Sequence, residues 1–553
     1  MKTIKKYYLI IALSVASVVS FSFVDNYFEI SKNLDIFTSL YKELNIFYVD
    51  ETDAGELMKT AIDAMLESLD PYTTYIPESE KEDFEFMTTG QYGGIGAVIS
   101  KQGDWVYVNE PYEGFPADKA GLIAGDKFVE IAGVSVKGKS TEDVSKILKG
   151  QPNTAVTVLI ERDGLEKPFE VEIVREEIRL SSVPYYGMLT DSIGYIKTRS
   201  FTRNISNEVA NAYKELNADE KLKGLVLDLR SNPGGLLNEA IKMANIFVGK
   251  GQEVVYTKGK VKDWDKSYKT KNNAINDSIP LVVLINRSSA SASEIVSGSI
   301  QDFDRGVVLG QRSFGKGLVQ QTRKLSYNSQ LKLTTAKYYI PSGRCIQAVD
   351  YSDRQDDGSV GKIPDSLRTE FKTLINKRPV FDGGGITPDI EIETRKYSNI
   401  LRSIISKRHI FNFANQFKAE NESIISAKNF VITDDVYNDF KQFLNDKEYE
   451  YETSTEKAIN SLKEDAEDEQ YYSDIEVELE KLKSKMIQSK NNDIERFKAE
   501  ISEVLEMEIA TRYYYQKGKV ESTIKHDKEI AEALKLLDNM DDYYAILSGD
   551  SIR

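Results

Sequence analysis

A serine-rich turn follows an apolar run near the middle of the chain. Residues 287–295 read Arg-Ser-Ser-Ala-Ser-Ala-Ser-Glu-Ile, directly after the apolar residues 281–285. This order predicts a strand, a turn of small residues and the start of a helix, so serine hydroxyls lie beside unpaired backbone N–H groups. Such N–H groups can stabilise a developing oxyanion. Taken alone, however, the segment is better interpreted as ordinary helix capping by serine.

A lysine between two glycines occurs in the segment 310–317, which reads Gly-Gln-Arg-Ser-Phe-Gly-Lys-Gly. The segment nearly matches the phosphate-binding pattern G-x-x-x-x-G-K-[ST], but Gly317 stands where a hydroxyl would hold magnesium, and residues 318–321 predict a strand. A buried lysine can be neutral near pH 7 and act as a base, and a serine–lysine pair catalyses without histidine. From this segment alone, Lys316 is better interpreted as an exposed loop lysine.

A glycine turn follows another predicted strand in residues 227–236, which read Leu-Asp-Leu-Arg-Ser-Asn-Pro-Gly-Gly-Leu. Backbone N–H groups at Gly234 or Gly235 could supply half of an oxyanion hole. The alternative is an ordinary tight connection that uses the backbone freedom of glycine. We interpret Asp228 and Arg230 as a structural ion pair and not as an acid–base couple.

A second glycine turn lies in residues 91–97, which read Gln-Tyr-Gly-Gly-Ile-Gly-Ala before a predicted strand. Successive glycines let backbone N–H groups converge on an anion such as a peptide carboxylate. A plain tight turn explains the same residues equally well. The segment therefore indicates a peptide-binding loop only in combination with other features.

Composition limits which chemistry the chain can use. Its 553 residues include 72 Lys and Arg against 88 Asp and Glu, with two His and one Cys, and a net charge of −16. The length predicts three or four domains at roughly 150 residues each. The negative charge argues against nucleic-acid binding, and Cys345 alone excludes an intramolecular disulfide or a multi-cysteine metal site. Because His409 and His526 both lie in the last third, catalysis elsewhere is expected to proceed without histidine.

The amino terminus carries an export signature. Lysines at positions 2, 5 and 6 precede residues 7–24, which contain no charged side chain. A basic start followed by an apolar stretch is typical of a secretory signal or an uncleaved membrane anchor with its lysines in the cytoplasm. We therefore expect the rest of the chain to lie outside the cytoplasm.

The pattern of the sequence changes along the chain. Apolar residues at helical spacing predict helices within residues 25–84, and short β-rich runs with glycine turns follow from residue 90 over about 90 residues. The middle third alternates strands and helices, the signature of an α/β domain with sites at the carboxyl ends of its strands. Residues 389–517 contain neither Gly nor Pro, are rich in Glu and Lys, and predict helices.

Taken in order, these segments resemble the carboxyl-terminal processing (tail-specific) serine proteases of bacterial envelopes and chloroplasts. The resemblance runs from about residue 40 to residue 394. It also includes Leu69-Asp70-Pro71-Tyr72, a PDZ-like stretch over 116–126, Pro341-Ser342-Gly343-Arg344 and Gly385-Ile386-Thr387-Pro388-Asp389. It implies a multidomain α+β fold in which a crotonase-like α/β core carries the protease site. The implied domains are a signal or anchor (1–24), an N-terminal helical region (25–84), a PDZ domain (85–177), the protease core (178–395) and a C-terminal helical domain (396–553).

The resemblance also implies roles for individual residues. The family's nucleophile falls on Ser291, its general base on Lys316, and the residue that orients this lysine on Gln320. Ser293, the neighbour most easily mistaken for the nucleophile, ranks behind Ser291. The remaining implied positions are the oxyanion donors Ala292 and Gly234 or Gly235, and the peptide-binding loop Gly93, Gly94, Ile95 and Gly96.

The implied function is an ATP-independent serine endopeptidase that needs no metal or cofactor. It would recognise exported proteins by a free C-terminus through its PDZ domain, in the periplasm or anchored to the inner membrane facing the periplasm. An activating adaptor and a homodimer are further partners that the resemblance leaves open, and membrane contact requires an uncleaved N-terminal segment. The main alternative is a non-catalytic PDZ adaptor on an inactive protease scaffold, and a P-loop ATPase is a distant third. The resemblance gives no role to residues 396–553, which could be a support, a dimerisation arm or a substrate-handling domain.

Overall fold

The computed structural model describes residues 27–354, 360–490 and 492–550. The described residues divide into two compact units, one of residues 27–76 together with 322–333, and the other of the described residues 77–321 together with those from 334 to 550. Among the described residues, no helix combines the length and the apolar character that a membrane span needs. The segment 7–24, which we expect to be a signal or anchor, lies outside the described residues.

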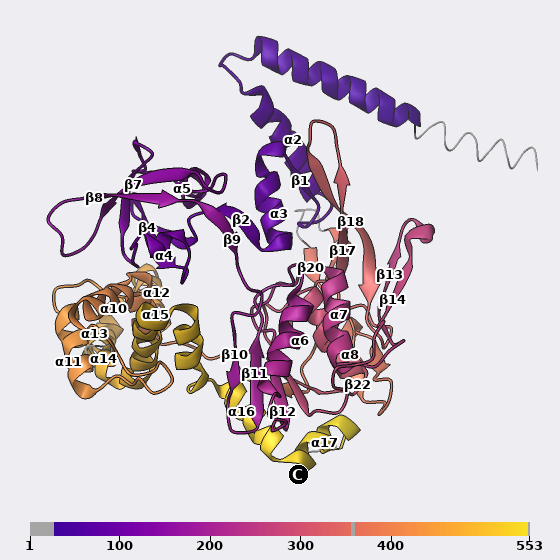
Figure 1. Cartoon of the computed structure of the whole chain (residues 1–553). Helices are drawn as coiled ribbons and strands as arrows, with labels where there is room; N and C mark the ends of the chain where they lie inside the picture. Colours follow the sequence, from indigo (N-terminus) through magenta and orange to yellow (C-terminus); the bar gives the residue numbers. More distant parts are fainter. Residues whose placement is uncertain (1–26, 355–359, 491, 551–553) are drawn as a thin grey trace, which may run out of the picture. The chain divides into compact units, whose positions relative to one another are not determined.

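The first unit consists mainly of helices, coloured indigo in Figure 1. A helix covers residues 27–47, and α2 (Ala54–Glu67) begins after Asp53, whose carboxylate accepts the N–H of Glu56 at 3.0 Å. The short strand β1 (Thr74–Ile76) pairs antiparallel with residues 330–332. The two helices confirm the helical prediction for this part of the chain, whereas the strand β1 was not predicted.

Residues 77–179 contain a β-rich module. η1 (Glu78–Glu80) and α3 (Lys81–Thr89) lead into β2 (Gln91–Gly94), which pairs antiparallel with β9 (Glu176–Arg179). The main sheet has the strand order β3-β4-β5-β7-β8, with β6 beside β5. Its elements are β3 (Ala97–Gln102), β4 (Trp105–Pro111), α4 (Pro116–Lys119), β5 (Lys127–Ile131), β6 (Val134–Ser135), α5 (Thr141–Leu148), β7 (Ala155–Glu161) and β8 (Phe169–Val174).

Alternating side chains build the core of this module. Along β7, Val156, Val158 and Ile160 are buried, because successive side chains of a strand point to opposite faces. Ser140 caps α5 by accepting the N–H of Asp143 at 3.1 Å. In the part of the chain that the structure describes, β3 pairs with β4 alone, so its outer edge is open to another strand.

The middle of the chain forms a six-stranded sheet with the order β10-β11-β12-β15-β16-β23. All neighbouring strands are parallel except β10 and β11. Helices lie in the crossover connections from β11 to β12, from β12 to β15 and from β15 to β16, as is usual for parallel strands. The elements are β10 (Tyr185–Met188), β11 (Ile193–Lys197), α6 (Ile205–Leu216), β12 (Gly224–Asp228), α7 (Leu237–Phe247), β15 (Leu281–Ile285), α8 (Ala292–Asp302), β16 (Val307–Gly310) and β23 (Ile390–Glu391).

Both faces of this sheet are covered by helices. On β12, Leu225 and Leu227 pack with α6, α7 and α8, whereas Val226 faces the opposite side. That side is covered by α16 (Lys528–Asp538) and α17 (Met540–Ser548), the last helices of the chain (Figure 1). The sheet is therefore buried on both faces, which explains why its strands are continuous apolar runs.

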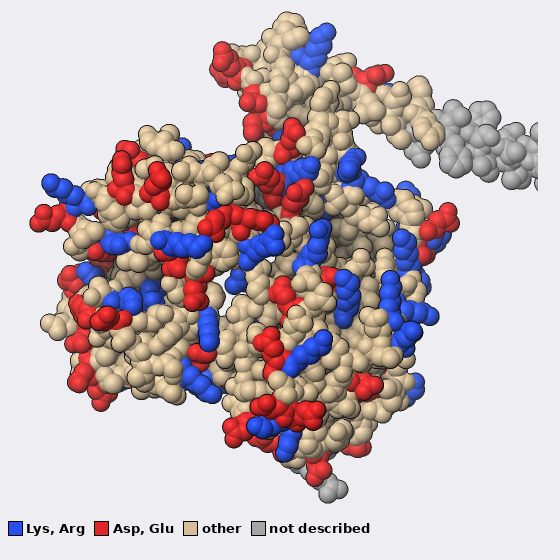
Figure 2. Space-filling view, viewed as in Figure 1, with Lys and Arg blue, Asp and Glu red and all other residues tan. Residues whose placement is uncertain are grey.

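A second sheet contains β13 (Glu253–Gly259) between β14 (Lys266–Lys269) and β18 (Gln330–Tyr339), and β17 (Leu318–Lys324) also pairs with β18. Six lysines occur between residues 258 and 271, and Figure 2 shows basic side chains gathered over this region. The overall negative charge is therefore unevenly distributed. The remaining small elements are η2 (Lys262–Trp264), β19 (Val349–Arg354), β20 (Val360–Lys362), η3 (Asp365–Leu367), β21 (Glu370–Lys372) and β22 (Pro379–Phe381).

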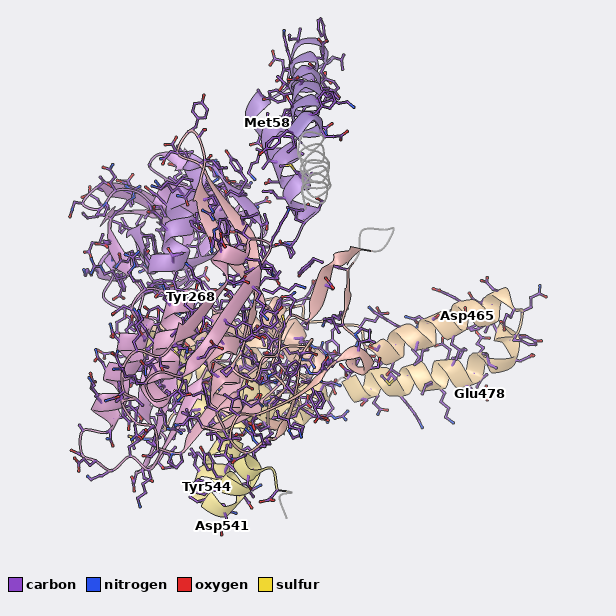
Figure 3. The ribbon with its side chains drawn as sticks, turned by 90° about the vertical axis from the view of Figure 1, so that its right-hand side faces the viewer. Met58, Tyr268, Asp465, Glu478, Asp541 and Tyr544 are labelled. Carbon is purple, nitrogen blue, oxygen red and sulfur yellow. The ribbon has the colours of Figure 1, made fainter. Side chains whose placement is uncertain are left out.

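Residues 399–548 consist mainly of helices, as predicted. A bundle packs around a shared apolar core, and a two-helix hairpin projects from it, with Asp465 and Glu478 labelled on its two helices in Figure 3. α15 is interrupted by non-helical backbone at Tyr514 and Tyr515. The bundle consists of α9 (Asn399–Ser406), α10 (His409–Glu420), α11 (Asp434–Leu444), α14 (Asp493–Arg496) and α15 (Lys498–Ile524), and the hairpin of α12 (Ser454–Asp468) and α13 (Tyr472–Lys490). The predicted fold class, with a helical start, a PDZ-like module, an α/β core and a helical extension, is confirmed.

Candidate active site

The serine turn connects β15 to α8 at the carboxyl end of the central sheet. Ser291 is the N-cap of α8 and has φ 55° and ψ −113°. A positive φ is unfavourable for a residue with a Cβ, so the surrounding structure must hold this turn in place. The side chain of Ser291 is half-buried, whereas every residue of α8 is buried. The strained turn thus places the half-buried Ser291 at the start of a fixed helix.

The lysine loop connects the neighbouring strand β16 to β17. Lys316 is half-buried in this loop, and the strand β17 begins two residues later. A phosphate-binding loop needs a helix at that point, so the strand excludes the P-loop interpretation. Because β15 and β16 are parallel neighbours, the serine turn and the lysine loop leave the same edge of the sheet.

One buried carboxylate joins the two loops. The Oε2 atom of Glu294 accepts the backbone N–H of Ser291 at 2.7 Å and that of Lys316 at 2.9 Å. Its Oε1 atom accepts the N–H of Gly315 at 2.7 Å and the hydroxyl of Ser313 at 2.5 Å. Burial raises the pKa of Glu294 to about 7, although these hydrogen bonds lower it. The backbones of Ser291 and Lys316 are therefore held close together by the same carboxylate oxygen.

A phenol joins the same two residues through their carbonyl groups. The Oη atom of Tyr338, on β18, lies 2.5 Å from the carbonyl oxygen of Lys316 and 3.2 Å from that of Ser291. In addition, the N–H of Phe314 donates to the carbonyl of Ser289 at 3.0 Å. The structure thus brings the backbones of Ser291 and Lys316 close together, and their catalytic roles stay predictions.

The glycine turn after β12 lies directly against the serine turn. Gly234 has φ +92°, and a Cβ on it would lie 2.8 Å from the backbone nitrogen of Ala292. Its own N–H donates to the side chain of Asn232 at 3.0 Å. Within the described ranges, the N–H groups of Ala292 and Gly235 have no acceptor. Of the predicted oxyanion donors, Ala292 and Gly235 are therefore available, whereas the N–H of Gly234 is engaged.

Ser293 is fully buried, whereas Ser291, two residues earlier, is only half-buried. Its hydroxyl donates to the carbonyl of Asn232 at 2.8 Å, and the N–H of Ala290 donates to the same carbonyl at 3.1 Å. This hydroxyl therefore fastens the serine turn to the glycine turn. Its burial and its hydrogen bond support the lower rank that the sequence gives it as a nucleophile.

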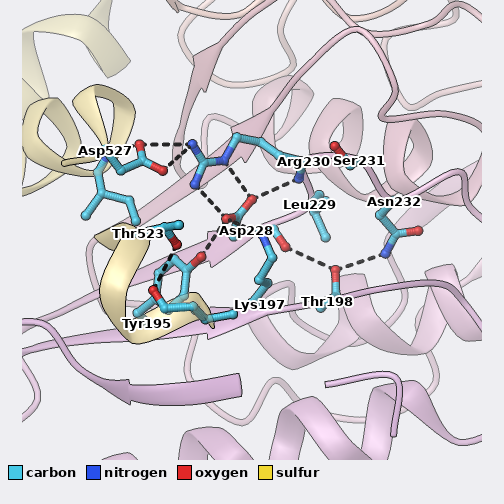
Figure 4. A network of polar contacts seen from close by, with 12 residues as sticks. Tyr195, Lys197, Thr198, Asp228, Leu229, Arg230, Ser231, Asn232, Thr523 and Asp527 are labelled. Atoms are coloured by element: carbon cyan, nitrogen blue, oxygen red, sulfur yellow. Dashed lines mark hydrogen bonds and ion pairs between the residues drawn. The ribbon is translucent and has the colours of Figure 1, made fainter. Parts of the chain in front are cut away.

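Asp228 and Arg230 form the predicted structural ion pair, shown in Figure 4. The guanidinium of Arg230 contacts both carboxylate oxygens of Asp228, at 2.7 and 3.0 Å. Burial raises the pKa of Asp228, but the charges of Arg230 and Lys197 outweigh this and hold it well below its usual range. Arg230 also reaches Asp527 at 2.8 Å and Glu529 at 3.0 Å. The network anchors the end of β12 and the turn that follows it to α16.

Gln320 lies on β17, four residues beyond Lys316. Its amide nitrogen donates to the hydroxyl of Thr334 on β18 at 3.2 Å. This contact fixes the side chain between the two strands. The role of Gln320 in orienting the lysine stays a prediction.

The predicted peptide-binding loop lies at the start of the β-rich module. Gly93 and Gly94 belong to β2, and Ile95 packs in the core of the module. Gly96 has φ +73°, and a Cβ on it would lie 2.6 Å from the Cβ of Phe115. The loop leads directly into the open-edged strand β3.

Sequence reasoning missed two residues that join the loops, Glu294 and Tyr338. Glu294 carried a signal, because an acidic residue three positions after an N-cap serine is the pattern of a capping box. Tyr338 carried none, since no local pattern connects β18 to the serine turn. Within the described residues, no group of three or more His, Cys, Asp or Glu side chains is arranged to hold a metal ion.

Comparisons with known proteins match three parts of the chain. The family model "Peptidase family S41" covers residues 192–352, "PDZ domain" covers 107–162, and "Probable PDZ-protease, C-terminal helical domain" covers 400–537. A "Carboxy-terminal-processing protease" of Bartonella bacilliformis is 38% identical over 321 residues, which are 58% of this chain and 73% of the relative. A "Probable CtpA-like serine protease" of Staphylococcus aureus is 35% identical over 401 residues, 71% of this chain and 72% of the relative. The solved "photosystem II D1 C-terminal processing protease" is 27% identical, with a TM-score of 0.35, over 65% of this chain and 92% of that chain.

Proposed function

Because this chain belongs to the carboxy-terminal-processing serine proteases of peptidase family S41, we propose that it hydrolyses peptide bonds with Ser291 as nucleophile and Lys316 as general base. The observation that carries this assignment is the double connection between the two residues, through Glu294 at their N–H groups and Tyr338 at their carbonyl groups. The strained backbone at Ser291 also supports it, because a sharp strand-to-helix turn exposes the nucleophile in other hydrolases.

In the proposed reaction, neutral Lys316 removes the hydroxyl proton of Ser291 as its Oγ attacks the peptide carbonyl. The oxyanion of the tetrahedral intermediate accepts hydrogen bonds from the N–H of Ala292 and from the glycine turn, where Gly235 has the available N–H group. The protonated lysine then gives its proton to the leaving amine. A water molecule repeats the sequence on the acyl-enzyme and releases the new carboxyl terminus.

We propose that substrates enter by a free C-terminus. The loop Gly93–Gly96 would receive the carboxylate on its N–H groups, and the peptide would add as a strand to the open edge of β3. Main-chain hydrogen bonds of this kind give affinity without demanding one side-chain sequence. The mode suits an enzyme that selects many chains by their ends.

We propose that the enzyme acts on exported proteins in the cell envelope. The basic start and uncharged residues 7–24 support this placement. The alternative of an inactive adaptor is not favoured, because Ser291 and Lys316 are both present and joined. An activating adaptor and a homodimer remain proposals for separate binding experiments.

The test uses an unfolded protein substrate without ATP. Ser291→Ala and Lys316→Ala should each reduce cleavage at least about 1,000-fold, because both members of the dyad act in one step. Ser288→Ala is the matched control, since Ser288 is an exposed serine of the same turn, and it should keep wild-type activity. Wild-type rates in either dyad variant would contradict the assignment.

A further inference from the structure

Glu294 is a buried acid whose four acceptor positions are all occupied by donors from the two loops of the site. The N–H of Ser291 comes from the serine turn, and the N–H groups of Gly315 and Lys316 come from the lysine loop, as does the hydroxyl of Ser313. The Glu294 side chain has no exposed surface. A carboxylate offers about four lone-pair positions, so this site is matched to the ionised form.

The protonated form fits these surroundings poorly. Three of the four partners are backbone N–H groups, which cannot accept a hydrogen bond from a carboxylic acid O–H. The Ser313 hydroxyl donates to Glu294 and accepts the N–H of Ile386 at 2.6 Å, so among the four partners only Ser313 could accept the O–H of a protonated Glu294. A neutral carboxyl group also accepts weaker hydrogen bonds than a carboxylate, so protonation would weaken the N–H contacts that join Ser291 to Lys316.

We propose that Glu294 is a positioning residue whose ionised carboxylate holds the backbones of Ser291 and Lys316 at the separation that proton transfer needs. This inference rests on the proposed Ser–Lys function and deepens it. Glu294 itself touches no reacting atom, and it acts through the serine and the lysine. Displacing reacting groups by about 1 Å can reduce the rate roughly 100-fold. The Glu294 carboxylate, which we call the clamp because it binds both loops, should therefore affect the rate strongly.

The pH dependence follows from the groups that face Glu294. Ser291 faces it from its own helix, and Lys316 and Ser313 face it from the lysine loop. The phenol of Tyr338 binds the same two backbones from β18. Both the base Lys316 and the clamp Glu294 must lose a proton for catalysis, so activity falls on the acid side for two reasons. Since burial raises the pKa of Glu294 to about 7, Glu294 should add one unit to the slope of log kcat/KM against pH below about pH 7.

Glu294→Gln tests the clamp directly. The amide keeps the shape but turns an NH2 group toward backbone donors, so kcat should fall about 100-fold while KM stays within about twofold. The unit of slope that Glu294 adds below about pH 7 should disappear in this variant. Glu239→Gln is the matched control, because Glu239 is also buried and accepts the N–H and the hydroxyl of Ser206, away from the dyad. The control should leave kcat and the pH slope unchanged.

Ser313→Ala is a milder variant that decides the question if Glu294→Gln fails to fold, as judged by thermal unfolding. It removes one donor to the carboxylate, so the pKa of Glu294 should rise and the break in slope should move up by roughly one pH unit. The inference about Glu294 would be overturned if the break in the pH profile stays in place in Ser313→Ala, or if Glu294→Gln has the same kinetics as Glu239→Gln. If Ser291→Ala and Lys316→Ala are inactive in the same assays, the proposed function still stands. Wild-type activity in those two variants would overturn the proposed function, and this inference with it.

Discussion

Arg230, at the carboxyl end of β12, is paired at 2.8 Å with Asp527, the N-cap residue of α16, across 297 residues of sequence. Arg230 also binds Asp228, which is fully buried. The turn that carries Gly234 begins directly after Arg230. The last helices of the chain are therefore fastened to the strand end that positions one side of the candidate active site (Figure 4).

Removing Arg230 should destabilise the fold strongly. Arg230→Ala leaves the carboxylate of Asp228 buried without its main partner, and breaking a buried pair from one side costs about 3–5 kcal/mol of unfolding free energy. Lys221→Ala is the control, because Lys221 and Asp219 form an exposed pair at 3.6 Å, and exposed pairs contribute less than about 1 kcal/mol. Urea denaturation measures both, and equal midpoints for the two variants would contradict the role of the network.

A chain that ends after residue 526 should not fold stably. It lacks α16 and α17, whose apolar side chains cover Val226, Val282 and Leu284 on one face of the central sheet. The exposed sheet face would aggregate, so soluble expression should be lost. Deleting the projecting hairpin 454–490 with a short linker is the contrasting variant, and it should leave a soluble protein with the thermal transition of the core. Soluble, cooperatively folded protein from the shorter chain would show that the two helices are dispensable.

Gly234→Ala should inactivate the enzyme by displacing the serine turn. The new Cβ would lie 2.6 Å from the carbonyl oxygen of Ala290 and 2.8 Å from the nitrogen of Ala292, closer than van der Waals contact allows. We expect kcat/KM to fall at least about 100-fold. Gly249→Ala meets no atom within 4 Å and should keep full activity. An active Gly234→Ala enzyme would mean that the glycine turn does not support the site.

Peptide binding should depend on the glycine loop and on a free carboxylate. Gly96→Ala places a Cβ 2.6 Å from the Cβ of Phe115 and should weaken binding of a labelled C-terminal peptide at least about tenfold. The same peptide with an amidated end should bind wild-type protein just as weakly. Fluorescence anisotropy measures both affinities, preferably in Ser291→Ala protein to prevent cleavage. Equal affinities for the free and amidated peptides would rule out carboxylate recognition.

The unfolding free energy of the protein should depend on pH through the titration of Glu294. Because burial raises the pKa of this carboxyl from 4.5 unfolded to about 7 folded, the folded state binds the proton more tightly. Its contribution is therefore fully present below about pH 4.5 and is lost as the pH rises through 7, by about 3 kcal/mol. Glu294→Gln should flatten this part of the profile of unfolding free energy against pH, compared with Glu239→Gln. Parallel profiles for the two variants would contradict the raised pKa.

Local rules could predict that Ser291 and Lys316 lie in loops after strands, whereas their pairing as nucleophile and base came only from the resemblance to a protease family. Each follows a short apolar strand, and in a parallel sheet neighbouring strands end at the same edge. The helical region after residue 395 could also be predicted from the sequence, since the spacing of its apolar residues and its lack of Gly and Pro favour helices.

The residues that contact Ser291 and Lys316 could not be predicted from the sequence, because long-range packing decides these contacts. The apolar stripe of α16 predicts a helix with one buried face, but nothing in its spacing says that the face covers the central sheet and not the helical bundle. Tyr338 joins two loops from a third strand, and Glu294 reads locally as an ordinary helix cap. The engaged N–H of Gly234 depends on the exact placement of Asn232, which no motif gives.

The most direct test of the account is to label the nucleophile with a fluorophosphonate, which reacts with an activated serine, and to find the modified residue by peptide mass spectrometry. Wild-type protein should carry the adduct on Ser291, and Lys316→Ala should react at least about 100-fold more slowly because the serine loses its base. An adduct on any other residue, or labelling of Lys316→Ala at the wild-type rate, would contradict the Ser291–Lys316 mechanism.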